Sequence, residues 1–150
     1  GVFSDITKAD IHSHPVTGVK IDGFHVPLWK DVIDLAEKAA LELFSRNDRS
    51  EVDFIINCIQ YPDYYKPTTA CLLQKRLGLR SDIGAYDINL EGSGFVYGLA
   101  MAKGLIAGGV AGSVLLLTSS CTSGYIHPKD LAGRYLFGDG AAAAARPRRQ

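Results

Sequence analysis

The most constraining feature of this 150-residue sequence is the segment 94–106, in which Lys103 is the one charged residue. Its spacing is typical of a helix, and a helix that is apolar nearly all round needs other elements over most of its surface. We therefore expect this helix to lie inside the protein, with polar residues and turns confined to the segments around it.

Short apolar runs alternate with helical patterns on both sides of this segment. Residues 53–59 and 113–118 are typical of strands buried on both faces, and residues 85–89 predict another strand. Residues 28–46 and 70–77 predict helices; Thr68 or Thr69 could cap the second, and Gly78 could stop it. Strand and helix in alternation predict βαβ units, hence an α/β fold with a mostly parallel sheet covered on both faces.

The remaining segments carry weaker patterns. Residues 1–27 have no clean period, and we expect loops and turns there, including a turn at Asp22-Gly23. Residues 119–135 also predict a loop, and 141–145 begin like a strand of small residues. The length of 150 residues predicts a single domain over 1–150.

Composition excludes several classes of function. Sixteen Lys and Arg balance sixteen Asp and Glu, so no chain-wide basic surface exists for nucleic acid or anionic lipid. Three cysteines without paired spacing do not make a disulfide scaffold. No apolar run approaches the ~20 residues of a membrane span, and no signal peptide pattern opens the sequence. We expect a cytoplasmic protein.

The glycine-containing loop at 92–98 lies between a predicted strand and the apolar helix. Such a loop could bind phosphate, but a dinucleotide site needs an acidic residue about 20 positions on, and the next strand ends in Thr118-Ser119-Ser120. A Gly-x-Ser-x-Gly nucleophile elbow also fails, because Glu91 and Phe95 stand where glycines are needed around Ser93. Ser93 is instead predicted to cap the helix.

Histidines and cysteines give no site of their own. His12 and His14 form a possible metal pair, but no cysteine or carboxylate stands at ligand spacing beside them, so we predict no metal. Cys58 falls in a predicted strand and Cys71 in a predicted helix, where a free cysteine behaves as a small hydrophobe. Cys121 falls in a predicted loop.

Four segments in order resemble the ketoacyl-ACP synthase III family of the thiolase superfamily. They are residues 67–78, residues 87–99 with Asp-Ile-Asn and Ser-Gly-Phe-Val-Tyr-Gly-Leu, residues 125–130, and residues 137–141 with Phe-Gly-Asp-Gly-Ala. The resemblance covers about residues 28–145 and implies a thiolase-like fold, of which this chain is most of the first of two similar halves. The family's first strand would lie before Gly1, and its second half would be missing.

The resemblance also implies a chemistry. Family members use a cysteine at the start of the buried helix to take an acyl group from coenzyme A, and then condense it with malonyl-ACP. They take a helper histidine and asparagine from the second half. Gly92 stands at the cysteine position, preceded by Glu91, and Leu131 stands where the family carries an arginine near the coenzyme A mouth. The thioesters are substrates, and no resident cofactor is implied.

Three functions remain open. The chain could be an acyltransferase of fatty acid or polyketide assembly that is impaired by the missing nucleophile, a pseudoenzyme in that respect. It could be a non-catalytic partner subunit that binds acyl chains or an active synthase. It could also be a decarboxylase-like or thioesterase-like variant that uses Glu91. Candidate site residues are Glu91 and Gly92 for catalysis and Lys66, Ser93 and Leu131 for substrate binding.

The resemblance further implies a homodimer. In the family, the segment before Pro67 lies at the dimer interface and reaches the neighbour's pocket, and the strand after the buried helix pairs across the two-fold axis. Here these elements are residues 64–66 and 113–118.

Overall fold

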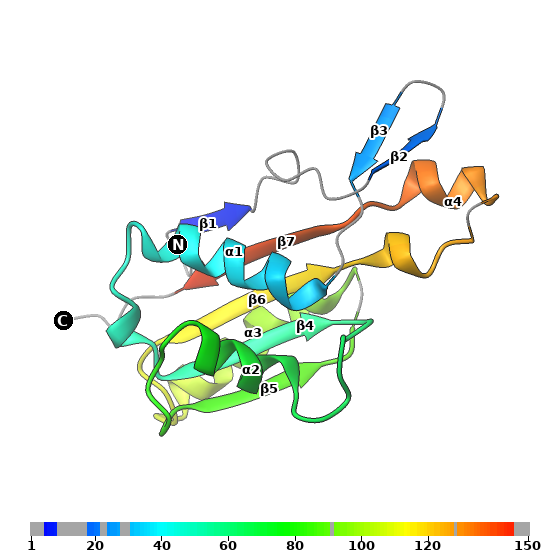
Figure 1. Ribbon diagram of the computed structural model, residues 1–150. Helices are drawn as coiled ribbons and strands as arrows, with labels where there is room; N and C mark the ends of the chain where they lie inside the picture. Colours follow the sequence, from blue (N-terminus) through cyan, green and yellow to red (C-terminus); the bar gives the residue numbers. More distant parts are fainter. Residues whose placement is uncertain are drawn as a thin grey trace.

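The computed structural model describes residues 5–8, 18–21, 24–27, 31–90, 92–127 and 129–145; before residue 31 it describes the backbone alone. A five-stranded sheet in the order β1-β7-β6-β4-β5 forms the centre of the molecule (Figure 1). Its strands are β1 (Asp5–Lys8), β4 (Phe54–Ile59), β5 (Gly84–Ile88), β6 (Val114–Ser120) and β7 (Gly140–Ala145).

The sheet is mixed, with most of its strands running one way. β4 pairs in parallel with both β5 and β6, whereas β7 runs antiparallel to β6 and to β1. The side chains of β7, which lies between β6 and β1, are all small because the strand contains five alanines. The α/β prediction with a mostly parallel sheet is confirmed.

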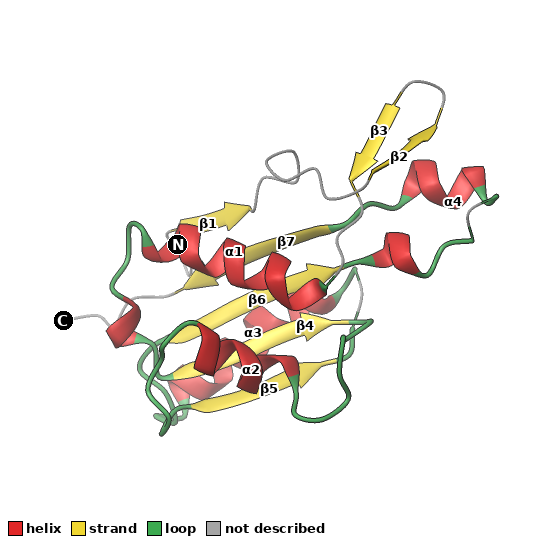
Figure 2. Cartoon of the chain, viewed as in Figure 1, coloured by secondary structure: helices red, strands yellow, loops and turns green. Residues whose placement is uncertain are grey.

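Helices cover both faces of this sheet (Figure 2). α1 (Val32–Phe44) and α2 (Thr69–Arg76) lie on one face, where they bury side chains that include Leu35, Leu43 and Leu73 against Ile55, Leu115 and Leu117. α3 (Gly94–Ala107) lies on the other face, against Ile56, Cys58, Val114 and Leu116. The alternation of side chains along β4 and β6 thus supplies both cores.

Within the described residues, α3 is buried on one side, whereas the sequence predicted burial over most of its surface. Its buried residues are Gly94, Gly98 and Ala102. On its outward side, Val96 is 66%, Tyr97 57% and Met101 42% exposed. No described element covers that side of the helix, so the apolar pattern indicates a surface that needs a partner element rather than a core within these residues.

Two segments predicted to be loops contain regular structure. The first 27 residues hold β1 and a hairpin of β2 (Gly18–Ile21) and β3 (Phe24–Pro27); the turn expected at Asp22-Gly23 lies outside the described residues. Residues 119–135 contain the end of β6, the short helix η3 (Thr122–Gly124) and most of α4 (Leu131–Leu136). The early strands are four residues each, too short to show a period, and β1 forms through long-range pairing with β7.

Two helices are capped by carboxylates that are remote in the sequence. Thr68 occupies the N-cap of α2 but its side chain makes no cap bond; Asp87 accepts hydrogen bonds from the Thr69 and Ala70 N–H groups at 2.7 and 2.8 Å. The predicted N-cap position of Thr68 is confirmed, but the prediction that a threonine side chain caps the helix is wrong. Asp63 likewise accepts from the N–H groups of the first two residues of α1, at 3.1 and 3.0 Å.

The strand predicted to pair across a two-fold axis cannot do so. β6 is hydrogen-bonded to β4 on one side and to β7 on the other, so its backbone groups are already used. That prediction is wrong. Among the described strands of the five-stranded sheet, β5 and β1 are the edge strands.

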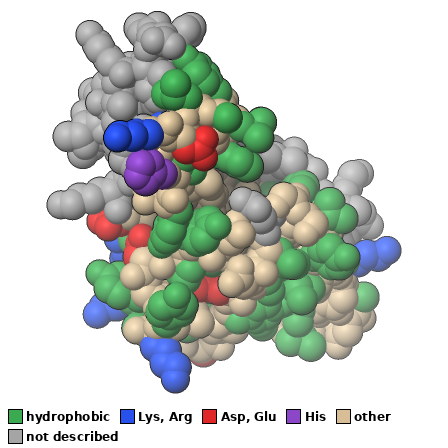
Figure 3. All heavy atoms as spheres, turned by 90° about the vertical axis from the view of Figure 1, so that its right-hand side faces the viewer, with side chains coloured by type: hydrophobic (Ala, Val, Ile, Leu, Met, Phe, Trp, Pro, Cys, Tyr) green, Lys and Arg blue, Asp and Glu red, His purple; other side chains and the backbone are tan. Residues whose placement is uncertain are grey.

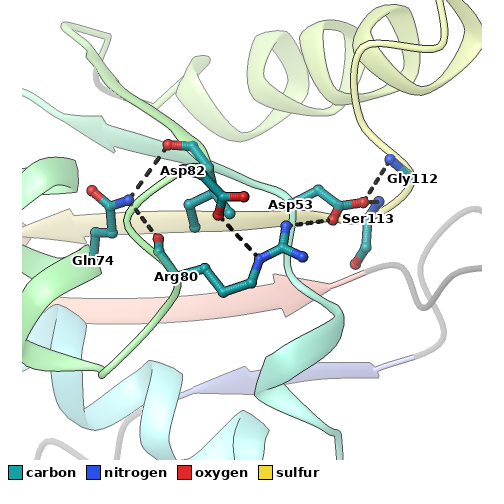
Figure 4. A network of polar contacts seen from close by, with 7 residues as sticks. Asp53, Gln74, Arg80, Asp82, Gly112 and Ser113 are labelled. Carbon is teal, nitrogen blue, oxygen red and sulfur yellow. Dashed lines mark hydrogen bonds and ion pairs between the residues drawn. The ribbon is translucent and has the colours of Figure 1, made fainter.

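A polar network lies at the end of the sheet where β4 begins (Figure 4). One oxygen of the Asp53 carboxylate accepts from the N–H groups of Gly112 and Ser113 at 2.9 and 3.1 Å, and the other pairs with Arg80 at 3.1 Å. Asp53 thus ties the turns before β5 and β6 to the start of β4. The network lies away from the other end of the sheet, where the parallel strands finish and where a site could be placed.

Candidate functional site

A cavity of about 600 Å³ opens at the carboxyl end of the parallel strands, beside the start of α3. Figure 3 views the molecule from this end and shows hydrophobic side chains spread over much of the described surface. In open α/β sheets ligands bind at this edge, where strand ends and helix starts converge. The lining residues come from the ends of β4, β5 and β6 and from the start of β7: Cys58, Gln60, Leu90, Gly92, Thr118, Ser119, Ser120, Thr122, Phe137, Gly138, Gly140, Ala141 and Ala142.

The cavity wall is mostly small and apolar. Alanine and glycine form the β7 side, and Leu90 and Phe137 add larger apolar surface. The polar side chains are the Gln60 amide and the hydroxyls of Thr118, Ser119, Ser120 and Thr122. The Ser120 and Thr122 hydroxyl oxygens lie 2.6 Å apart. None of the described residues that line it is charged, so the cavity suits a neutral, largely apolar ligand with a few polar atoms.

Gly92 faces open space. A Cβ added at this position would have no atom within 4 Å outside the residue and its chain neighbours. The backbone there also lies outside the left-handed region, so a side chain could be accommodated without strain. The structure therefore brings the predicted residue Gly92 into the cavity, at a point with room for a side chain that this sequence lacks.

Ser93 lies at the predicted N-cap position, but its side chain does not cap the helix. It occupies the N-cap of α3, is exposed, and makes no side-chain cap bond, so the capping prediction is wrong. The positive end of the α3 dipole is consequently left without a side-chain acceptor from its own N-cap.

The two buried thiols are held in the neutral form. Cys58 lines the cavity and donates to the Gly94 carbonyl at 3.1 Å; burial, and then the negative charge of Asp87, raises the pKa of its thiol to about 11. Burial, and then Asp139, raises the pKa of Cys121 to about 12. Cys71 is exposed on α2 and does not line the cavity. The predictions of a strand for Cys58, a helix for Cys71 and a loop for Cys121 are confirmed.

Two other candidate residues, Lys66 and Leu131, do not line the cavity. Lys66 is exposed in the segment between β4 and α2, and Leu131 is 52% exposed at the start of α4; neither lines the cavity. Glu91 lies outside the described residues. Sequence reasoning missed Thr118 and Ser120, which the rule that parallel strands end at one edge could have found. It also missed Phe137 and Ala142, which reach the cavity through the antiparallel pairing of β7 with β6.

Turns next to the cavity are fixed by short polar and aromatic contacts. Asp139 is buried and accepts from the Ser123 N–H at 2.9 Å and from its hydroxyl at 2.5 Å, which holds the turn before β7 against η3. Tyr61 stacks on Tyr125 with ring centroids 4.1 Å apart, joining the segments that follow β4 and β6.

Two broader features concern the described residues as a whole. Within them, no group of His, Cys, Asp and Glu is arranged to hold a metal ion, and the side chains of His12, His14 and His25 lie outside the part that is described. No helix of the described chain is both long and apolar enough to cross a membrane.

Comparisons with known proteins agree with this geometry. Residues 86–146 match the family of 3-oxoacyl-[acyl-carrier-protein] synthase III. Beta-ketoacyl-[acyl-carrier-protein] synthase III 2 of Staphylococcus epidermidis is 41% identical over 115 residues, which cover 77% of this chain and 33% of that protein. The synthase III of Coxiella burnetii (strain CbuK_Q154) is 42% identical over 108 residues, or 72% of this chain and 34% of that protein.

Solved structures extend the likeness to nearly the whole chain. A crystal structure of 3-oxoacyl-(acyl-carrier-protein) synthase III superposes with a TM-score of 0.88 at 38% identity, over 99% of this chain and 50% of that one. The synthase III of Thermus thermophilus gives a TM-score of 0.80 at 28% identity, over 100% of this chain and 52% of that one.

The sheet order, the helices on both faces and the superpositions define an α/β half-fold of the thiolase-like class. Within that class, the chain shows homology to beta-ketoacyl-ACP synthase III. It spans about half the length of the solved structures and about a third of the curated relatives.

Proposed function

We propose that this chain is part of a synthase III-like acyltransferase of fatty acid or polyketide biosynthesis that binds acyl thioesters but no longer transfers them through position 92. The observation that carries the proposal is the open space at Gly92 in the cavity wall. The resemblance assigns the nucleophilic cysteine of the family to this position. The cavity therefore has space for a cysteine side chain at position 92, but the sulfur is absent.

The cavity favours an acyl chain as its ligand. Its volume of about 600 Å³ falls within the range of small-molecule sites, and its wall of Ala, Gly, Leu and Phe offers apolar contact. Each buried methylene of an acyl chain contributes about 0.8 kcal/mol. The hydroxyls of Thr118 and Ser120 could meet the polar atoms of a thioester carried by coenzyme A or acyl carrier protein.

Covalent transfer needs a thiolate, and the described residues offer none in the cavity. Gly92 has no side chain, and the pKa of the Cys58 thiol is raised to about 11. A neutral thiol whose hydrogen is donated to the Gly94 carbonyl is a poor nucleophile. A bound acyl thioester should therefore stay intact.

The role of a binding partner is the second candidate, favoured by the free edge of the sheet. β5 has no strand beyond it among the described residues. Tyr64 and Tyr65, in the segment between β4 and α2, are 59% and 92% exposed. An unprotected edge strand is a ready surface for pairing with another chain. We infer a homodimer in which β5, rather than β6, lies at the two-fold axis and residues 64–66 contact the second copy.

The third function, with Glu91 as an acid–base group, remains a prediction from the sequence. Glu91→Gln removes its charge at nearly constant size. If Glu91 acts in decarboxylation or hydrolysis, thioester turnover by the full-length protein should fall at least about tenfold in this variant.

Equilibrium binding tests the proposed function. We expect hexanoyl-CoA to bind the protein without forming a bond, as measured by titration calorimetry. Gly92→Phe should weaken binding at least about tenfold, because the ring would fill the space intended for the acyl group. Gly104→Phe is the matched control, since a Cβ at Gly104 on α3 also has no atom within 4 Å but lies outside the cavity lining. Binding that is absent, or unaffected by Gly92→Phe, contradicts the proposal.

A further inference from the structure

Hydroxyl side chains gather on one wall of the cavity, at the end of β6. Thr118, Ser120 and Thr122 all line the cavity and are all partly exposed. Thr118 and Ser120 are two residues apart on β6, so they point to the same face of the sheet, the face that carries α3. On the neighbouring strand, Ala142 pairs with Thr118 and Gly140 pairs with Ser120. Only small groups therefore stand beside these hydroxyls on the β7 side.

Ser120 and Thr122 form a hydroxyl pair that can still bind a polar atom. Their oxygens lie 2.6 Å apart, and either one can be the donor. This bond uses one of the two hydroxyl hydrogens, so the other hydrogen and the remaining lone pairs can serve a ligand. Ser119 differs, because it is 5% exposed and its hydroxyl donates to the Asn57 side chain at 3.3 Å. The pair, rather than Ser119, is the group that can recognise a polar atom in the cavity.

The surroundings of the pair favour an uncharged polar atom on an otherwise apolar ligand. None of the described residues that line the cavity is charged, and Gln60 contributes a neutral amide. A charge that is buried without an opposite charge is strongly disfavoured, whereas a neutral oxygen needs only a hydrogen bond. Leu90 and Phe137 offer apolar contact to the rest of the ligand. A hydroxyl or keto oxygen on a hydrocarbon chain fits this combination.

We propose that the Ser120–Thr122 pair selects acyl chains that carry a hydroxyl or keto oxygen over plain hydrocarbon chains of the same length. The inference rests on the thioester binding proposed above and adds the class of acyl chain. Thr118 lies about 7 Å from Ser120 along the strand, so a thioester oxygen at Thr118 leaves the pair for a second oxygen. A plain chain would displace water from the pair without replacing its hydrogen bonds, which lowers the affinity.

Titration calorimetry of the full-length protein with three thioesters tests this selection. The ligands are hexanoyl-CoA, 3-hydroxyhexanoyl-CoA and 5-hydroxyhexanoyl-CoA, which share chain length and charge and differ in the presence and position of one oxygen. We expect at least one hydroxylated thioester to bind about three- to tenfold more tightly than hexanoyl-CoA, the range of one net hydrogen bond. The two hydroxylated ligands place the oxygen at different distances from the thioester, so the comparison also locates the pair along the bound chain.

Removal of the two hydroxyls assigns the preference to the pair. The double variant Ser120→Ala/Thr122→Val should bind hexanoyl-CoA at least as tightly as the unchanged protein and lose the preference for the hydroxylated chain. Each single substitution should reduce the preference as well, so the test does not depend on the double variant. Ser45→Ala is the matched control, because it removes a hydroxyl that donates to the Glu42 carbonyl at 2.7 Å, outside the cavity lining. It should leave the ratio of affinities unchanged.

The outcomes separate this inference from the proposed function. If none of the three thioesters binds, the proposed function is overturned and the selection with it. If hexanoyl-CoA binds at least as tightly as both hydroxylated thioesters, the selection alone is overturned. If a hydroxylated thioester is preferred but the preference is unchanged by Ser120→Ala and by Thr122→Val, the role of the pair is overturned. A general loss of folding would weaken all three ligands together and would not change the ratio of their affinities.

Discussion

Gly92 and Cys58 line the same cavity, and the proposed function depends on both of them at the scale of single residues. Gly92 leaves open space where a side chain would reach the ligand. Cys58 has the sulfur, but with a pKa of about 11 it is ionised in only about one molecule in ten thousand at pH 7. The cavity can therefore select a ligand by shape and polarity, while the residues that form it supply no ready nucleophile.

The raised thiol pKa values predict a pH dependence of reactivity and stability. In the unfolded chain the thiols of Cys58 and Cys121 ionise near pH 8.5, whereas the fold favours the neutral forms up to about pH 11 and 12. Their contribution to stability is thus fully present below about pH 8 and is lost as the pH rises toward 11.

Urea unfolding and thiol modification check this prediction. Between pH 8.5 and 10.5, the free energy of unfolding should fall less in Cys58→Ala than in the unchanged protein. At pH 8, the disulfide reagent DTNB should modify Cys71, which is exposed, much faster than Cys58 and Cys121. Rapid modification of Cys58 in the folded protein at pH 8 would contradict its assigned environment.

At the scale of elements, the position of α3 depends on how closely it approaches the sheet. A Cβ at Gly98 would lie 2.5 Å from Cδ1 of Leu116 and 3.0 Å from Sγ of Cys58. Glycine at this position lets the helix backbone lie against β4 and β6, which sets where its first turn meets the cavity. At Gly104, on the same helix, a Cβ would meet no atom within 4 Å.

Alanine at these two glycines should have opposite effects on stability. Gly98→Ala should destabilise the protein by about 1–3 kcal/mol, because the methyl group forces α3 away from the sheet. Gly104→Ala should stabilise it by about 0.5–1 kcal/mol, because alanine is the better helix former and has room. Urea unfolding of both variants measures the two changes, and equal effects of the same sign would refute this account of the packing.

The elements that the sequence predicted well are those with a strong local pattern. The apolar runs that predict β4 and β6, and the helical spacing that predicts α1 and α2, depend on side chains within a few positions of one another. Each of these four elements lies within a few residues of its prediction. β1 and the remote caps Asp63 and Asp87 depend on contacts between distant parts of the chain. The same limit applies to the site: Gly92 was found through the resemblance, whereas Thr118, Ser120 and Ala142 join it only when β6 and β7 lie side by side.

At the scale of the whole molecule, the exposed side of α3 and the greater length of the relatives both indicate that this helix needs a covering element. Val96 and Tyr97 are more than half exposed on a helix with one charged residue, and the matched synthase structures are about twice as long as this chain. An apolar helix face of this kind needs cover in the working protein. The activity proposed above should therefore be tested in the full-length protein.

Incubation with radiolabelled acyl-CoA, followed by denaturing electrophoresis and peptide mapping, tests the central claim most directly. We expect no stable label near position 92 in the unchanged protein, and label on the new sulfur in the Gly92→Cys variant of the full-length protein, since the cavity has room for that side chain. Stable label at the start of α3 in the unchanged protein would contradict the claim that covalent transfer at this position has been lost.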